Sequence, residues 1–204
     1  PVTAVYVAVC VGMKGGVRYV AITRSYCNVL SDGTHQAFSM GGAPNPAADE
    51  GDGMGGFLPS ARDVKVMNNT IMGMYGVAFS FAGCVDCEAS DNLVTTTLGL
   101  ARIGTDPDVR AGFAYAQALT VNAVLRRNQM AFLPVDCVPA QGDACFALQV
   151  NNTAEAVGLV GDVNVYTSTG GTSPSYTWGI GVSHTLTTFR TASGTETTST
   201  IVTP

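Results

Sequence analysis

The sequence carries little charge and few lysines. Charged residues make up 12% of the 204 residues, lysine occurs only at Lys14 and Lys65, and basic residues do not cluster. A nucleic-acid-binding surface needs clustered lysine or arginine to neutralise phosphates, so the composition argues against that class. No run of about 18 apolar residues is present, so the sequence indicates no membrane-spanning helix.

The sequence also lacks the regular leucines of a leucine-rich repeat and the apolar spacing of helical repeats. Its apolar residues instead alternate with polar or small ones, as in Val64 and Val66 or Val77, Phe79 and Phe81. Alternation of this kind is typical of β-strands. With 46% hydrophobic residues and 24 glycines, the chain is large enough for a substantial core, and we predict an all-β fold.

Four asparagines recur within one pattern of apolar neighbours. Asn92 follows Asn69 by 23 residues and Asn151 follows Asn128 by 23, whereas Asn92 and Asn128 are 36 apart. The longer interval fits an inserted loop, and such a period indicates a solenoid. Together with the alternation, it predicts a right-handed parallel β-helix with long loop insertions. Asparagine tolerates left-handed turns and can bond to a stacked copy of itself, so we expect these four to form a ladder.

The alignment extends to both sides of this region. Ser25 takes the asparagine position one repeat earlier, and Phe146 and Leu148 align with Ala123 and Leu125. We therefore place the β-helix coils in residues 1–165. Residues 166–204 are expected to hold a last coil or a Thr/Ser-rich β extension. Because the chain starts with proline, we also expect a processed protein or a piece of a larger one.

The chain has six cysteines, which suits a secreted protein. A C-x-x-C motif also occurs in redox and zinc sites, but this one has no helical pattern after it and no second pair of ligands. We favour a structural role, as a disulfide or as buried thiols, for that motif. The candidate disulfide cysteines are Cys137 with Cys145, Cys10 with Cys27, and Cys84 with Cys87.

No residue is assigned to catalysis, to a cofactor or to a metal. Asp32 and His35 lack the partners of a polygalacturonase-like site, and we interpret them as a turn followed by a solvated histidine. A lyase-like site would need a basic residue beside calcium-binding carboxylates, and Lys65 with Glu88 is explained by an ion pair between neighbouring coils. The acidic loop residues with weak calcium-binding potential are Asp49, Glu50 and Asp52.

Two N-x-T sequons place candidate glycosylation sites at Asn68 and Asn151. Asn68 lies beside a ladder position and is expected to face outward, whereas Asn151 occupies such a position, which weakens its candidacy. The aromatic residues that could stack on a carbohydrate are Tyr75, Tyr176 and Trp178.

Spaced glycines followed by an N-x-V-x-x-T-x-G stretch resemble the repeats of pectate-lyase-like β-helix proteins, and most closely those of fibrocystin-like extracellular proteins. The resemblance covers about Val17 to Val165, although Leu100 stands where those repeats often have histidine. It implies a large secreted or cell-surface protein. The matching residues are Gly76, Gly83, Asn92, Val94, Thr97 and Gly99.

These features predict a structural or adhesive extracellular element that belongs to a larger cell-surface or filament assembly. Its partners would be other protein chains or further segments of the same protein. The alternative is a polysaccharide-active lyase or hydrolase, or a carbohydrate-binding module. An enzyme should bring three or more charged or histidine side chains together on one exposed β face, so an enzyme is the less favoured reading.

Overall fold

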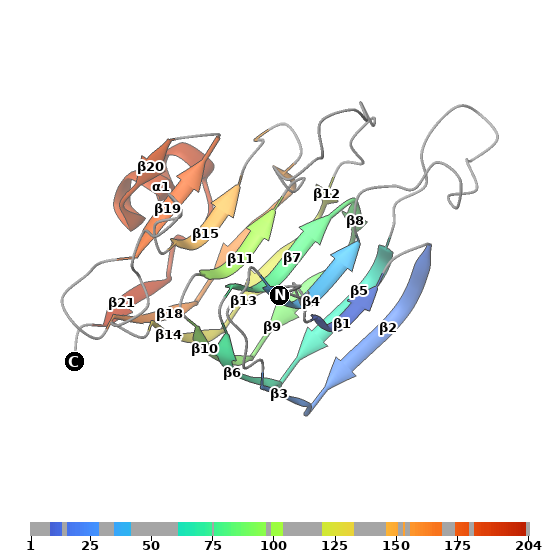
Figure 1. Cartoon of the computed structure of the whole chain (residues 1–204). Coiled ribbons are helices and arrows are strands. Elements are labelled where there is room, and N and C mark those ends of the chain that lie inside the picture. Colours follow the sequence, from blue (N-terminus) through green and yellow to red (C-terminus); the bar gives the residue numbers. More distant parts are fainter. Residues whose placement is uncertain are drawn as a thin grey trace, which may run out of the picture.

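The computed structural model describes most of the chain. The described residues are 9–13, 16–28, 35–41, 61–74, 76–96, 99–103, 120–132, 146–150, 153, 156–168, 174–179 and 182–202. Three sheets, whose strands pair in parallel with a single exception, and one helix account for the regular structure of these residues (Figure 1). The predicted all-β class is therefore confirmed. No helix in these ranges is long and apolar enough to cross a bilayer.

Each repeat begins with one or two strands of the eight-stranded sheet. A left-handed residue divides most of these strands into two short halves. In chain order they are β2 (Val17–Thr23), β5 (Ala61–Met67), β8 (Cys84–Val85) with β9 (Glu88–Ser90), β12 (Thr120–Val121) with β13 (Val124–Arg126), and β16 (Ala156–Val157) with β17 (Val160–Asp162).

The six-stranded sheet follows after a short turn. Its strands are β3 (Tyr26–Asn28), β6 (Thr70–Met74), β10 (Leu93–Thr96), β14 (Gln129–Phe132), β18 (Val165–Ser168) and β21 (Thr200–Val202). The seven-stranded sheet comes third. Its strands are β1 (Val9–Met13), β4 (His35–Gly41), β7 (Gly76–Ala82), β11 (Gly99–Ile103), β15 (Phe146–Val150), β19 (Ser175–Trp178) and β20 (Ser183–His184).

Within the described ranges, the chain passes through the three sheets in this order five times. We call each pass a circuit; the first comprises β2, β3 and β4, and the fifth ends with β19. Strands of successive circuits pair in parallel, so colour in Figure 1 runs in sequence order from β2 to β21. The one antiparallel pair joins β19 to β20. Each circuit thus repeats the previous one, one strand further along.

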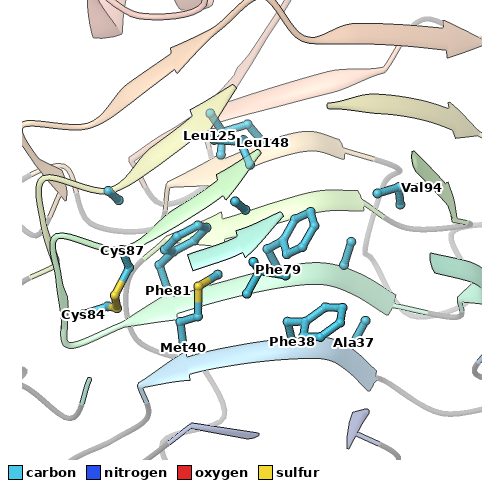
Figure 2. Packing of buried hydrophobic residues seen from close by; sticks show 14 of the residues in the cluster. Ala37, Phe38, Met40, Phe79, Phe81, Cys84, Cys87, Val94, Leu125 and Leu148 are labelled. Carbon is cyan, nitrogen blue, oxygen red and sulfur yellow. A yellow bond between two sulfur atoms is a disulfide. The ribbon is translucent and has the colours of Figure 1, made fainter. Parts of the chain in front are cut away.

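Residues that face the interior stack directly on their equivalents in neighbouring circuits. In the six-stranded sheet the register aligns one row of buried side chains along the whole stack. Phe38 and Phe79 stack in the seven-stranded sheet with ring centroids 6.0 Å apart and meet Leu125 and Leu148 in the same core (Figure 2). The buried row of the six-stranded sheet is Cys27, Ile71, Val94, Met130 and Tyr166, and the partly buried Ile201 continues it.

Left-handed residues turn the chain at two fixed places in every circuit. One column of them interrupts the strands of the eight-stranded sheet, and the other ends those strands just before the six-stranded sheet begins. Because left-handed geometry disfavours most side chains, the repetition marks a backbone requirement of the turn. The first column is Tyr19, Asp63, Asp86, Asn122 and Gly158, and the second is Arg24, Asn68, Asp91, Arg127 and Val163.

The alignment of Phe146 and Leu148 with Ala123 and Leu125 is wrong. Phe146 and Leu148 belong to β15 of the seven-stranded sheet, where they pair with Gly99 and Ala101. Leu125 pairs instead with Gly161 of the next circuit. The error arises because residues 133–145 intervene between β14 and β15. A step of 23 residues from β13 therefore reaches the third sheet and not the next circuit.

The region after residue 165 contains a helix that we did not expect. Helix α1 (Leu186–Ser193) starts with a capping box between Thr185 and Thr188, and Gly194 ends it with a left-handed cap. Its threonine-rich sequence has modest helix propensity, so packing of Leu186 and Phe189 in the core stabilises it. After the helix, β21 pairs in parallel with β18 and begins a further circuit.

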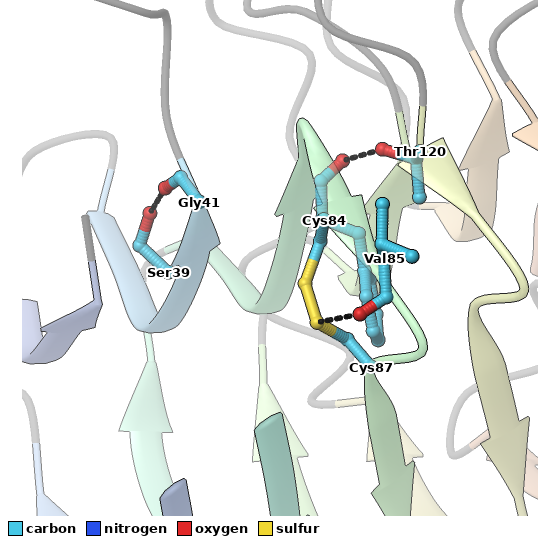
Figure 3. The surroundings of a disulfide bond; sticks show 7 residues. Ser39, Gly41, Cys84, Val85, Cys87 and Thr120 are labelled. Carbon is cyan, nitrogen blue, oxygen red and sulfur yellow. Dashed lines mark hydrogen bonds between the residues drawn. A yellow bond between two sulfur atoms is a disulfide. The ribbon is translucent and has the colours of Figure 1, made fainter. Parts of the chain in front are cut away.

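Two disulfides join cysteines of the described residues. Cys10 and Cys27 link β1 to β3 with a Cα–Cα distance of 6.2 Å. Cys84 and Cys87 are bonded with a Cα–Cα distance of 6.1 Å across the left-handed Asp86 (Figure 3). Both cysteines of the C-x-x-C motif are fully buried between strands and do not lie at a helix N-terminus, which favours the structural reading. The pair Cys137 and Cys145 lies outside the described residues.

Candidate functional site

A ladder of buried asparagines runs along the junction between the eight-stranded and six-stranded sheets. The backbone N–H and the side-chain Nδ2 of each asparagine both donate to Oδ1 of the asparagine in the next circuit. All six of these bonds measure 2.9–3.1 Å. The ladder consists of Asn69, Asn92, Asn128 and Asn164, each at most 2% exposed.

The second Nδ2 hydrogen of each ladder asparagine bonds back to the preceding circuit. The acceptors are backbone carbonyls of the eight-stranded sheet, at 2.9–3.1 Å. Each side chain therefore ties three circuits together and leaves no amide hydrogen unpaired. Buried amides without partners would cost about 1–3 kcal/mol each, so a fully bonded column stabilises the turn it occupies. The acceptors are Ile22, Val66, Ala89 and Leu125.

The ladder includes Asn69, Asn92 and Asn128 as expected, but its fourth member differs from the expectation. Asn164 bonds to Asn128 and lies 36 residues after it, the interval that also separates Asn92 from Asn128. Asn151 lies outside the described residues, and the ladder position next to Asn128 is already filled. Asn151 was expected from the same alignment that misplaced β15, and the repeated interval of 36 was the signal that pointed to Asn164.

Different residues end the ladder on its two sides. In the first circuit, the N–H of Ser25 donates to Asn69 Oδ1 at 2.9 Å. At the other end, the N–H of Asn164 donates to Ser199 Oγ at 2.9 Å, and its Nδ2 donates to Glu196 Oε1 at 3.0 Å. A hydroxyl and a carboxyl together thus replace the next asparagine.

Glu196 lies fully buried at the end of the ladder in a left-handed conformation. Gly161 pairs in register with Leu125 of the neighbouring circuit. Because Gly161 has no side chain, the carboxyl group of Glu196 occupies the space that a side chain at residue 161 would fill. Burial raises the pKa of Glu196 to about 7, while hydrogen bonds from Ser199 and Asn164 oppose that shift. Among the described residues, its Oε2 atom has no hydrogen-bond partner. A buried carboxyl with a pKa near neutrality can hold or release a proton under ordinary conditions.

Arg190 of α1 and two tyrosines surround this carboxyl group. Arg190 donates to the backbone carbonyls of Glu196 and Ser199 and so holds the chain after the helix against it. Tyr166 and Tyr176 contact each other edge to face with ring centroids 5.6 Å apart. Both hydroxyls are buried and have no hydrogen-bond partner in the part of the chain that the structure describes. Burial, with the nearby Glu196 charge, raises the pKa of both tyrosines.

A cavity of about 650 Å³ opens beside this end of the molecule, between α1, β19, β20 and β21. Its lining is rich in hydroxyl groups and includes His184 and Arg190. The Nε2 atom of His184 is buried and has no hydrogen-bond partner within the described ranges, and the His184 ring contacts Phe189 edge-on. The hydroxyl-bearing residues of the lining are Ser175, Ser183, Thr185, Thr187, Ser199 and Thr200.

Charged side chains on the eight-stranded sheet form separate ion pairs between neighbouring circuits. Arg126 contacts Glu88 at 3.0 Å, and Arg127 makes two bonds of 2.7 Å to Asp91. The Arg127 side-chain hydrogen bond lowers the pKa of Asp91. On the next circuit, the side-chain hydrogen bond from Thr198 lowers the pKa of Asp162. Asp91 and Asp162 are therefore held ionised, which suits a surface network better than proton transfer.

Lys65 pairs in register with Glu88, as the repeat predicted, but the ion pair of Glu88 in the described region is with Arg126. Arg126 lies diagonally to Glu88 on the next circuit, because its own register partner is Ser90. No group of three or more His, Cys, Asp or Glu residues in the described ranges is placed to hold a metal ion.

Several residues on the outer side of the seven-stranded sheet are buried. Ala37, Ala78 and Ala147 point away from the core row, yet all three are fully buried. Ser39 and Ser80, on the same side, are about 5% exposed. These five residues of β4, β7 and β15 are therefore not accessible to a polymer.

The aromatic residues suggested for carbohydrate stacking do not form such a surface. Tyr176 is fully buried against Tyr166 and Phe189, and Trp178 contacts Phe189 edge-on. Both therefore belong to the contact with α1, a helix that the sequence did not indicate. Tyr75 lies outside the described residues.

Of the two sequons, Asn68 is exposed at a left-handed turn, as expected from its place beside the ladder. Asp32 and the acidic loop residues Asp49, Glu50 and Asp52 lie outside the described residues, and the side chain of His35 is not described.

Sequence reasoning missed the residues at the carboxyl end of the stack. Glu196, Ser199 and Arg190 stand in a Thr/Ser-rich stretch without periodicity, and His184 is isolated in the sequence. Their proximity depends on α1 and β21 returning to the stack, for which the sequence carries no regular signal.

No family model, no curated protein and no solved structure matches the chain. The resemblance to pectate-lyase-like and fibrocystin-like repeats therefore stays an expectation.

Proposed function

We propose that this chain is a right-handed parallel β-helix of the pectate-lyase-like type and serves as a structural or adhesive element of an extracellular assembly. The observation that carries the proposal is the asparagine ladder, which links four consecutive circuits through a column of buried, fully bonded amides. A column of this kind stiffens a stack along its length, because each side chain bonds to the circuits before and after it.

The surface chemistry supports a structural role over a catalytic one. The ion pairs of the eight-stranded sheet each join two neighbouring circuits, and the pair with Arg127 lowers the pKa of Asp91. Such pairs are worth at most about 1 kcal/mol each and need no further role. The chain would contribute a rigid body whose loops and ends contact other proteins.

Two disulfides favour an oxidising compartment. We propose that the protein acts at the cell surface or outside the cell, with Asn68 as its glycosylation site. Intact mass measured on protein from its native source, before and after enzymatic deglycosylation and reduction, tests this. Six free thiols and no glycan would count against an extracellular location.

The cavity beside α1 favours one second candidate function, a carbohydrate-binding module. Its hydroxyl-rich lining with His184 and Arg190 offers the hydrogen-bond donors and acceptors that a sugar requires. This function would use the end of the stack and leave the β faces free.

One panel of experiments separates these functions. The purified chain is incubated with neutral and acidic polysaccharides, and both cleavage products and binding are measured. A structural element should neither cleave nor bind them. Cleavage of any polysaccharide would overturn the structural proposal, and binding that His184→Ala abolishes while Asn68→Ala does not would establish the cavity as a carbohydrate site.

A further inference from the structure

The two ends of the stack are finished differently. At the carboxyl end, β20 pairs with the last strand of the seven-stranded sheet, and Phe189 of α1 packs on Tyr176 and Trp178. At the amino end, β2 pairs only with β5 and β3 pairs only with β6 among the described strands. We call β2 and β3, with Arg24 and Ser25 between them, the first edge. Strand edges with unpaired backbone groups are templates for another strand.

The apolar row of the first edge is only partly covered. Val20 and Ile22 are half-buried, whereas their register partners Val64 and Val66 in the next circuit are fully buried. Beside them, Tyr19 is 78% exposed. One further strand against β2 would give Val20 and Ile22 the same cover that β2 gives to Val64 and Val66.

The ladder leaves an acceptor at this edge. The N–H of Ser25 is used by Asn69, whereas Ser25 Oγ makes one long contact of 3.4 Å, to the Thr23 carbonyl. At the opposite end, Ser199 occupies the equivalent position, and its Oγ accepts the N–H of Asn164. Ser25 Oγ is therefore placed to accept an N–H from a preceding circuit in the same way.

The charge at the first edge indicates the chemistry of the partner. Arg24 belongs to the second left-handed column, in which Arg127 binds Asp91 of the circuit before it through two hydrogen bonds. Arg24 and the exposed Arg18 make no ion pair among the described residues. An acidic residue one circuit before Arg24 would complete the arrangement already seen between Arg127 and Asp91.

We propose that the first edge docks a partner polypeptide as an additional parallel circuit, whose turn carries an acidic residue followed by an amide. The chain's own Asp91–Asn92 pair is the pattern for that turn. This inference rests on the proposed structural function and names the kind of partner. A second copy stacked head to tail does not supply that turn, because the equivalent residues at its carboxyl end are Thr198 and Ser199. Residues 1–8 contain no Asp, Glu or Asn.

The test uses a labelled synthetic peptide with the sequence of Glu88–Thr96, which contains the Asp–Asn turn, and the whole chain as receptor. Fluorescence anisotropy should show saturable binding that weakens with added salt. Arg24→Glu should weaken binding about tenfold or more, because it places like charges together. Lys65→Glu, the same change of charge one circuit inside the edge, should alter binding by no more than about twofold.

A reversed pair of charges completes the test. A peptide with lysine in place of Asp91 should bind the wild-type chain poorly and regain affinity for the Arg24→Glu variant, which also shows that this variant is folded. The proposal is overturned by absent binding at millimolar peptide, by equal effects of Arg24→Glu and Lys65→Glu, or by failure of the reversed pair. These outcomes would overturn only the docking proposal. The structural function is tested separately by the polysaccharide panel and is retained if that panel shows neither cleavage nor binding.

Discussion

Glu196 is the residue whose chemistry is most altered by its position. Its pKa of about 7 reflects removal from water at the end of the ladder, opposed in part by the hydrogen bonds of Ser199 and Asn164. The charged groups around it are Arg190 on α1 and Asp162 on β17, and the two tyrosines Tyr166 and Tyr176 complete its surroundings. The carboxyl group is thus a buried polar group retained for its bonds to the ladder.

We expect Glu196 to make the protein less stable as pH rises. The unfolded chain releases this proton near pH 4.5, whereas the folded chain keeps it to about pH 7, so the free energy of unfolding falls across that interval. Glu196→Gln removes the fall and should be more stable than wild type by about 2–3 kcal/mol at pH 8, with little difference below pH 4.5. Urea denaturation at both pH values measures this.

Asp162→Asn is the control for this experiment. The side-chain hydrogen bond from Thr198 lowers the pKa of Asp162. Asp162 therefore stabilises the folded chain at pH values above its pKa in the unfolded chain, and this stabilisation is lost as pH falls through its pKa in the folded chain. Both variants should therefore differ from wild type at pH 8 but in opposite directions, with Glu196→Gln more stable and Asp162→Asn less stable, and both should approach wild type at low pH. Identical pH profiles for Glu196→Gln and wild type would contradict the assignment.

Val163 is the one β-branched residue in the second left-handed column, where its side chain is 50% exposed. Left-handed backbone costs such a residue about 1–2 kcal/mol. Val163→Asn, which matches Asn68 in the same column, should raise the free energy of unfolding by about 1 kcal/mol. Val160→Asn, at an equally exposed position within a strand, should not stabilise the protein. Thermal and urea unfolding of both variants decide the matter.

At the level of elements, the asparagine ladder and the second left-handed column together form one repeated turn. The left-handed residue turns the chain, and the asparagine after it bonds to the turns on both sides. The exposed member of each turn varies freely, as Asn68, Asp91 and Arg127 show, because it faces solvent. The buried member is asparagine wherever two circuits flank it, since only an amide supplies both the acceptor and the donors.

Removing one ladder amide should therefore be costly. Asn128→Ala leaves the two donors of Asn92 without their acceptor and removes the Nδ2 donor from Asn164 Oδ1 and from the Ala89 carbonyl. This should lower the free energy of unfolding by about 3 kcal/mol or more. Asn122→Gly keeps a left-handed turn and loses only an exposed bond to Asp86, so it should cost less than about 1 kcal/mol. Similar losses in the two variants would disprove the role of the ladder.

For the whole molecule, most contacts join one circuit to the next, and the disulfides add local restraint. The Cys10–Cys27 bond closes a sequence separation of 17 and connects two sheets, whereas the Cys84–Cys87 bond spans a separation of 3 within one turn. A cross-link that closes a longer loop restricts the unfolded chain more strongly. The first bond should therefore contribute more to global stability than the second.

Two variants measure this difference, Cys84→Ala with Cys87→Ala and Cys10→Ala with Cys27→Ala. Loop entropy assigns about 3 kcal/mol to the longer loop and about 2 kcal/mol to the shorter one. Reduction should thus lower the free energy of unfolding by about 1 kcal/mol more in the Cys84→Ala, Cys87→Ala variant, which keeps the Cys10–Cys27 bond, than in the other variant. Denaturation with and without reductant gives both values, and comparing each variant with its own reduced form cancels the effect of the core substitutions. A greater loss in the variant that keeps Cys84–Cys87 would contradict the entropic account.

The repeat was recognisable wherever the circuits are short. Val64, Val66 and Asn69 recur as Cys87, Ala89 and Asn92 because two complete circuits follow one another with little inserted sequence. The same reasoning misplaced Phe146 and Leu148, since an insertion within a circuit has the same effect on sequence spacing as a change of sheet. Of the ladder, three members were predictable from the period, and Asn164 required knowing where the insertion falls.

The sequence by itself determined the strands, the parallel repetition and the asparagine turn, because the alternation and the spacing of residues are local properties that recur in every circuit. Only the tertiary structure decided how the stack ends. Because α1 folds back on the last strands, one end of the stack holds Glu196, Ser199, Arg190 and His184. The spacing of these residues in the sequence does not predict that they lie together. The uncovered first edge is likewise a property of the assembled sheets, since an unpaired strand has the same sequence pattern as a paired one.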